Sequence, residues 1–131
     1  MEIKIGLKGS MEATVTPTMT ASHFGSGAQE VLATPVMIGM MEGASATSLE
    51  PFLEAGQSSV GTRVDIAHLS ATPLNMKIRT ESEVIEVERR RILFSVKAFD
   101  EVGLIGEGTH ERFIIDAEKF MAKCNSKKAA K

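Results

Sequence analysis

Hydrophobic and polar residues alternate over much of this chain, with the period of two that is typical of half-buried β-strands. The first such stretch covers residues 2–16, where Ile3, Ile5 and Leu7 alternate with charged or small residues. Four more stretches follow, and they cover residues 58–68, 76–87, 91–99 and 104–116. The polar segments between these four are short, so the pattern predicts antiparallel hairpins, with Gly103 at a positive φ in the turn DEVG.

One segment, residues 34–55, departs from this alternation and predicts a helix. Thr34 precedes Pro35, a pairing that is typical of an N-cap followed by proline at the first helical position. The residues that follow are apolar around most of the helix circumference, which favours a buried helix over a surface one. We therefore predict a single α+β domain over residues 1–131, in which an antiparallel sheet wraps around one long central helix.

Two further segments lack a strong pattern. Residues 17–33 contain Pro17, Gly25 and Gly27 among Ser, Thr and His, a composition that predicts a loop, and we expect it to cover a site as a lid. Residues 119–131 form a basic tail, which we expect to fray.

The composition excludes several classes of function. The formal net charge is -2, from 15 basic and 17 acidic residues, which disfavours a nucleic-acid partner. The N-terminal residues lack the pattern of a signal peptide, and the least charged stretch still contains a glutamate and two glycines, so we expect a cytoplasmic protein without a membrane partner. The single cysteine, Cys124, offers neither an intrachain disulfide nor a zinc site. We expect no metal or redox cofactor.

Glu42 is the only charged residue between Val31 and Leu49, and it lies in the middle of the predicted helix. No residue three or four positions away carries a positive charge that could neutralise it. Because burying a lone carboxylate is costly, Glu42 should be exposed, paired with a residue from elsewhere, or a functional base.

His68 ends a strand whose even positions, from Val60 onward, form its more apolar face. A single histidine on such a face is more often a hydrogen-bonded core residue than a catalyst. Thr34 is explained by N-capping alone, and in one helix it would lie about 12 Å from Glu42. We hypothesise that Thr34 and Glu42 meet across a subunit interface.

The remaining candidates have a structural interpretation that we favour. His110 lies between charged residues in GEGTHERF, which favours a surface or strand-pairing role. The run Arg89–Arg91 favours a solvated turn, with phosphate binding as the alternative. His23, in the expected lid, is predicted to be exposed.

Three blocks of sequence, ATPVMIGMMEGA, SVGTRVDIAHLSATP and IGEGTHERFIIDAEKF, together resemble the fluoroacetyl-CoA thioesterase-like family of hotdog proteins. The resemblance spans about residues 31–123. The family pattern has a threonine, a glutamate eight positions later and a histidine twenty-six beyond that, which fall on Thr34, Glu42 and His68. The glycine that lies at the acyl carbonyl in this family falls on Gly61.

The resemblance implies a homodimer with active sites between subunits, and hydrolysis of a short acyl-CoA-type thioester. Glu42 would act as general base toward water or as nucleophile, His68 would protonate the departing thiolate, and Thr34 would orient one of them or act as nucleophile itself. The Gly61 N–H would stabilise the oxyanion.

One segment departs from the family pattern. The fluoroacetyl-specific member carries phenylalanines before its threonine, whereas this chain has GSGAQEV there, with Phe24 as the only nearby ring. We therefore expect Phe24 to contact substrate, without fluoroacetyl selectivity. The alternatives are a non-catalytic protein that binds acyl-CoA or another small ligand and, less favoured, a hotdog hydratase or dehydratase.

Overall fold

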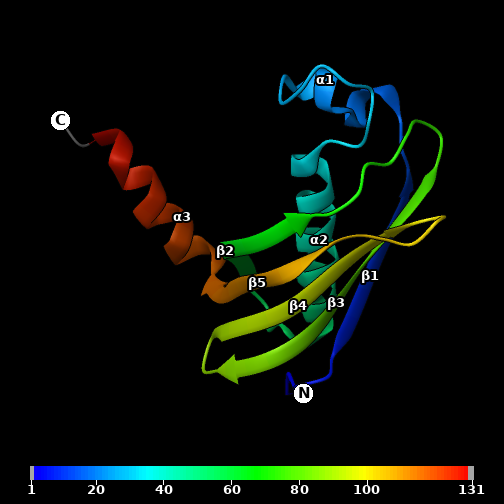
Figure 1. The fold of residues 1–131 in the computed structure, drawn as a ribbon. Coiled ribbons are helices and arrows are strands. Elements are labelled where there is room, and N and C mark those ends of the chain that lie inside the picture. Colours follow the sequence, from blue (N-terminus) through cyan, green and yellow to red (C-terminus); the bar gives the residue numbers. More distant parts are fainter. Residues whose placement is uncertain (1, 130–131) are drawn as a thin grey trace.

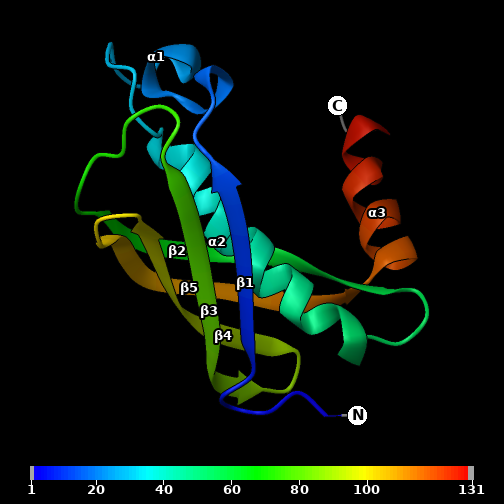
Figure 2. The same ribbon diagram turned by 90° about the vertical axis from the view of Figure 1, so that its right-hand side faces the viewer.

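The computed structural model describes residues 2–129 and consists of one sheet curved around one helix (Figures 1 and 2). The strands are β1 (Lys8–Thr14), β2 (Gln57–His68), β3 (Lys77–Glu88), β4 (Arg91–Asp100) and β5 (Leu104–Asp116). They form an antiparallel sheet in the order β1-β3-β4-β5-β2. Helix α2 (Thr34–Leu49) packs against this sheet, so the predicted architecture is confirmed.

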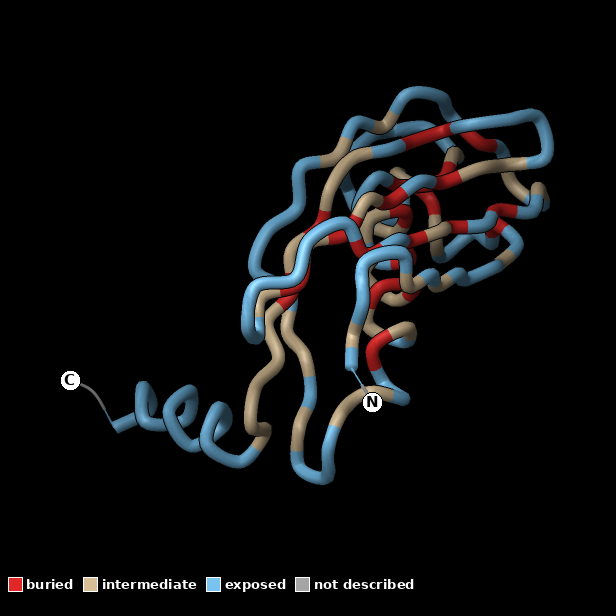
Figure 3. The backbone as a smooth tube through the Cα atoms, turned by 90° about the horizontal axis from the view of Figure 1, so that it is seen from below, coloured by how far each residue is buried: buried red, intermediate tan, exposed pale blue. Residues whose placement is uncertain are grey.

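The core lies between α2 and the sheet, where the buried residues gather in Figure 3. Three methionines of the helix, Met37, Met40 and Met41, are at most 7% exposed and pack on apolar residues of β3, β4 and β5. Strand β1 comes so close to the helix that a Cβ at Gly9 would collide with the Ala44 carbonyl. This layer fixes where α2 presents its side chains to the neighbouring strands.

The N-terminus of α2 differs from the prediction. The N-cap residue is Ala33, Thr34 is the first helical residue, and its side chain makes no capping hydrogen bond. The predicted N-cap role of Thr34 is therefore wrong. At the other end, α2 stops at Leu49 and a 3₁₀ turn, η2 (Glu50–Phe52), follows it, because Pro51 has no N–H to continue the helix.

The two hairpin turns are closed without the positive φ that we predicted for Gly103. Gly103 does not have a positive φ; instead the Asp100 carboxylate accepts hydrogen bonds from the N–H groups of Val102 and Gly103 and closes this turn. In the β3–β4 turn, Arg89 takes the left-handed conformation, with φ 57°. Strand β1 begins at Lys8, later than the alternation of residues 2–16 predicts.

The segment expected to act as a lid, residues 17–33, contains two short helical elements. It contains a 3₁₀ turn, η1 (Pro17–Met19), and a short helix, α1 (Ala21–Phe24), which lie at the N-terminal end of α2 (Figures 1 and 2). Backbone hydrogen bonds from Ala21 to Val31 and from Ala33 to Met19 tie it to the start of α2. It therefore borders the site that the N-terminal end of α2 helps to form.

The expected fraying tail is instead helix α3 (Ala117–Asn125), followed by a 3₁₀ turn, η3 (Ser126–Ala129). Figures 1 and 3 show α3 extending away from the body, and none of its residues is buried. Residues 1, 130 and 131, the ends of the two terminal segments, lie outside the described residues. Within residues 2–129, no helix is long and apolar enough to cross a membrane.

Candidate active site

A bulge in β2 determines which of its residues face the helix. The register with β5 shifts between Gly61 and Arg63, which leaves Thr62 as the extra residue. Because this insertion reverses the alternation, the prediction that even positions face the helix holds at the His68 end and is wrong for Val60 and Thr62. Gly61 faces the helix in their place, beside Glu42.

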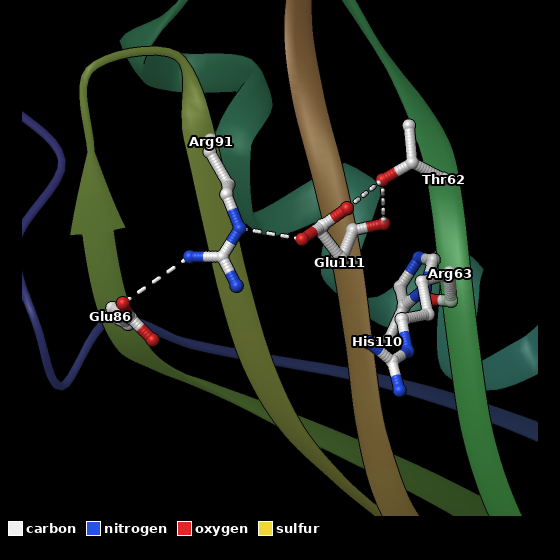
Figure 4. A network of polar contacts seen from close by, with 6 residues as sticks. All are labelled: Thr62, Arg63, Glu86, Arg91, His110 and Glu111. Carbon is white, nitrogen blue, oxygen red and sulfur yellow. Dashed lines mark hydrogen bonds and ion pairs between the residues drawn. The ribbon is translucent and has the colours of Figure 1, made fainter.

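A polar network on the opposite face holds this bulge (Figure 4). The Thr62 hydroxyl donates to the Glu111 carboxylate, at 2.6 Å, and to the Glu111 carbonyl, at 3.2 Å. Arg91 donates to the other carboxylate oxygen of Glu111 and forms an ion pair with Glu86 at 3.3 Å. The Thr62 and Arg91 hydrogen bonds lower the pKa of Glu111 below its ordinary value, so the network is charged at neutral pH.

This network also gives the run Arg89–Arg91 structural roles. Arg91 bridges Glu86 and Glu111, and Arg90 forms an exposed ion pair with Asp116 at 3.4 Å. Only part of the run is the solvated turn that we expected, and two of its three guanidinium groups are engaged with carboxylates rather than open to a phosphate.

Thr34 and His68 contact each other within one chain. The Thr34 hydroxyl, at the start of α2, lies 2.7 Å from His68 Nδ1, at the end of β2. Burial lowers the pKa of His68, so the ring is neutral at pH 7. Its Nε2 is buried and has no hydrogen-bond partner among residues 2–129. The pair lines a cleft of about 340 Å³ that Ala21 and Ser26 of the lid segment also border.

Phe24 does not line this cleft. Its side chain is 52% exposed and its ring lies against His23, with the ring centroids 5.4 Å apart. Substrate contact by Phe24 stays a prediction.

Glu42 lies in a second group of residues, around Gly61. A Cβ at Gly61 would lie 2.9 Å from Glu42 Oε2, 3.0 Å from His110 Cε1 and 3.4 Å from Arg112 Nη1. Glu42 is only partly buried, whereas His110 is 1% and Arg112 8% exposed. We call Glu42, Gly61, His110 and Arg112 the Glu42 cluster. Burial lowers the pKa of Arg112, and the Glu42 carboxylate opposes this shift, so of the three outcomes open to Glu42 the structure favours a charged neighbour from elsewhere, without an ion pair among residues 2–129.

The surface role expected for His110 is therefore wrong, and Arg112 was missed altogether. Both lie on the inward face of β5 with Ile114, as a period of two from Ile114 predicts. We did not infer an inward face here because the strand is rich in charged residues, and charged residues such as arginine are rarely buried without a partner.

The structure leaves the predicted site divided between two places. No hydrogen bond or ion pair joins the Thr34–His68 pair to the Glu42 cluster within residues 2–129. Thr34 and Glu42 lie on one helix, eight residues and about 12 Å apart. One chain thus brings Thr34 to His68 and Glu42 to Gly61, but it does not bring the two groups together.

Comparison with known proteins assigns the family. The family model of fluoroacetyl-CoA-specific thioesterases matches residues 15–118. The chain belongs to this family. It is 37% identical to the fluoroacetyl-CoA thioesterase of Streptantibioticus cattleyicolor over 134 residues, which cover 98% of this chain and 96% of that protein. The predicted resemblance is confirmed, and so is the assignment of the chain as a thioester hydrolase.

Solved structures agree with this assignment. A mutant of the fluoroacetyl-CoA-specific thioesterase, crystallised in complex with fluoroacetate and CoA, superposes with a TM-score of 0.86 at 37% identity, covering 90% of this chain and 99% of that one. A thioesterase superfamily member from Thermus thermophilus superposes with a TM-score of 0.91 at 32% identity, covering 98% and 95% of the two chains. The predicted hotdog fold is thereby confirmed.

Proposed function

We propose that this protein hydrolyses a short-chain acyl-CoA thioester to the free acid and CoA. The observation that carries the proposal is the position of the Glu42 carboxylate, which borders the backbone of Gly61 in the β2 bulge. A base beside a backbone N–H group is the pairing that acyl transfer needs, because the two serve the attacking water and the developing oxyanion. The related thioesterase crystallised with fluoroacetate and CoA supports CoA as the thiol.

In the mechanism that we propose, Glu42 removes a proton from water, and the hydroxide attacks the thioester carbonyl. The alternative is direct attack by the carboxylate to give an anhydride that water then opens. The Gly61 N–H stabilises the oxyanion, and the C–S bond breaks as it collapses. The departing thiolate takes up the proton that Glu42 removed from water, and the neutral His68 ring, which Thr34 orients through Nδ1, relays this proton.

This mechanism needs the two groups in one site, so we propose a homodimer in which the Thr34–His68 pair of one subunit faces the Glu42 cluster of the other. The buried His68 Nε2, which has no hydrogen-bond partner among residues 2–129, supports this arrangement. A buried polar atom without a partner costs about 1–3 kcal/mol, a cost that a group from a second subunit or a substrate would relieve.

Release of free thiol from a panel of short acyl-CoAs tests the proposed function. We expect turnover by the wild type and a loss of about 10²–10⁴-fold in kcat for Glu42→Gln, which keeps the side-chain shape but removes the base. Glu50→Gln, an exposed change one residue beyond the same helix, is the matched control and should keep full activity. Binding of CoA esters without thiol release would instead favour the non-catalytic binding protein.

Subunit exchange tests the shared site. Glu42→Gln and His68→Asn should each be inactive alone, but heterodimers of the two would carry one site with both residues intact. Random mixing should therefore restore about a quarter of the wild-type activity, since half of the dimers are mixed and half of their sites are intact. If Glu42 and His68 act within one chain, every site in the mixture carries one substitution, and no activity returns.

A further inference from the structure

His110 is held by hydrogen bonds on both ring nitrogens. Nδ1 lies 2.9 Å from the Arg63 carbonyl oxygen, and Nε2 lies 3.1 Å from Arg112 Nη1. A carbonyl only accepts and a guanidinium only donates, so the ring must carry its proton on Nδ1 and offer a lone pair at Nε2. The Phe94 ring stacks on His110, with centroids 6.3 Å apart and planes at 26°, which further restrains the ring.

Arg112 depends on such neutral acceptors. Its Nε donates to the Ser59 hydroxyl and its Nη2 to the Ser59 carbonyl, both at 2.9 Å, and Nη1 is held by His110. Ser59 therefore anchors one side of the guanidinium and His110 the other. Nη1, the nitrogen that His110 holds, is also the one nearest to Gly61.

We propose that His110 is a positioning residue of this site: its neutral, Nδ1-protonated ring holds the Arg112 guanidinium against Gly61 beside the Glu42 carboxylate, and protonation of the ring releases it. The proposal deepens the proposed function, on which it rests, because the group that His110 positions borders the carboxylate and the glycine assigned to hydrolysis. Arg112 then supplies a fixed positive charge at the place where negative charge develops.

The charges around the ring give this arrangement a pH dependence. Arg112 and Glu111 of β5 and Glu42 of α2 act on the ring through their charges, while Arg63 of β2 contributes its backbone carbonyl. Burial, and then the Arg112 charge, lower the pKa of His110 against the opposing effects of the Arg63 carbonyl and the two carboxylates, so the ring is neutral at pH 7. A second ring proton would replace the acceptor for Nη1 with a donor and place two cations in contact.

Two substitutions separate the acceptor from the rest of the ring. His110→Gln can place an amide oxygen near the position of Nε2, so it keeps an acceptor for Arg112 without a titrating group. His110→Asn reaches only as far as Nδ1, so it can keep the bond to the Arg63 carbonyl and loses the acceptor. We expect kcat to stay within about threefold of wild type for His110→Gln and to fall at least about tenfold for His110→Asn, with KM little changed in both. The fall in kcat that protonation of His110 causes at acidic pH should be absent in His110→Gln.

Nitrogen NMR of the wild-type imidazole rings provides a readout that is independent of activity and of variant folding. At pH 7 we expect His110 to show a protonated Nδ1 and an unprotonated Nε2. The opposite tautomer, a doubly protonated ring, or wild-type kcat in a folded His110→Asn would each overturn the proposal. If the wild type hydrolyses no thioester, the proposed function fails, whereas the NMR spectrum still decides whether His110 can hold Arg112.

Discussion

Gly61→Ala adds one methyl group at the centre of the Glu42 cluster. The new Cβ would lie 2.9 Å from Glu42 Oε2 and 3.0 Å from His110 Cε1, whereas ordinary van der Waals contacts begin near 3.4 Å. The His110 ring cannot recoil easily, because hydrogen bonds hold both of its nitrogens and Phe94 stacks on it. The Glu42 carboxylate must therefore give way, by about half an ångström or more if contact distances are to return to 3.4–4 Å.

Two magnitudes follow from this displacement. Gly61 is exposed and Glu42 Oε2 ends a flexible side chain, so the free energy of unfolding should fall by no more than about 1 kcal/mol, the lower end of the range for overpacking, and Tm by a few degrees at most. A misplacement of a catalytic group by about 1 Å can lower the rate about 10²-fold. We therefore expect kcat to fall by about 10–10²-fold, a larger effect than the change in stability alone would produce at a temperature where the variant stays folded.

Steady-state kinetics on the best acyl-CoA of the wild type, together with thermal unfolding, measure both effects. Gly103→Ala makes the same chemical change in the β4–β5 turn, where the added Cβ meets no atom within 4 Å and φ is not positive, and it should leave both kcat and Tm unchanged. Wild-type kcat in a folded Gly61→Ala protein would refute the inference that Glu42 works from its position beside Gly61.

Two further predictions concern the other polar contacts of the site. Thr34→Val is nearly isosteric but removes the hydroxyl that contacts His68 Nδ1, so we expect it to lower kcat about tenfold. Thr34→Ser keeps a hydroxyl and should keep most of the activity. Equal kcat values for the two variants would show that the hydroxyl has no role. Burial lowers the pKa of His110 in the folded protein, so as pH falls the unfolded chain binds a proton at this ring before the folded protein does. The free energy of unfolding should therefore decrease below about pH 6.5, by at most about 1.4 kcal/mol per pH unit from this ring. Urea unfolding of wild type and His110→Gln at pH 7.5 and 5.5 measures this slope, and identical slopes would exclude a contribution from His110.

Features set by neighbouring residues in the sequence were predictable. The last strand has the predicted bounds, Leu104–Asp116. Strands β2 and β4 differ from prediction by one residue at one end and β3 by one residue at each end, because alternation is a local property. Glu42 stood out for a similar reason, as an isolated charge in an apolar helix.

Features that depend on partners distant in the sequence were not predictable. The bulge at Thr62 arises from pairing with Glu111, forty-nine residues away, and nothing in the sequence of β2 alone indicates where the alternation reverses. The same bulge brings Gly61 to Glu42, a contact that the spacing of residues along the chain did not predict. His110 was misjudged and Arg112 was missed, because their hydrogen-bond partners are each other, Ser59 and the Arg63 carbonyl, and partners on a second strand cannot be read from one strand.

The separation of Glu42 from His68 within one chain has an electrostatic consequence that can be measured. Burial lowers the pKa of His68 in the single chain, and no carboxylate among residues 2–129 opposes this shift. If the Glu42 carboxylate of a second subunit faces this ring, as we propose, it must favour the imidazolium and raise the His68 pKa above that of a protein without the charge. NMR titration of His68 in wild type and in Glu42→Gln should therefore give a lower pKa in the variant. An unchanged pKa would mean that Glu42 does not face His68 in the assembled protein, and hydrolysis would then have to use the two groups at separate places.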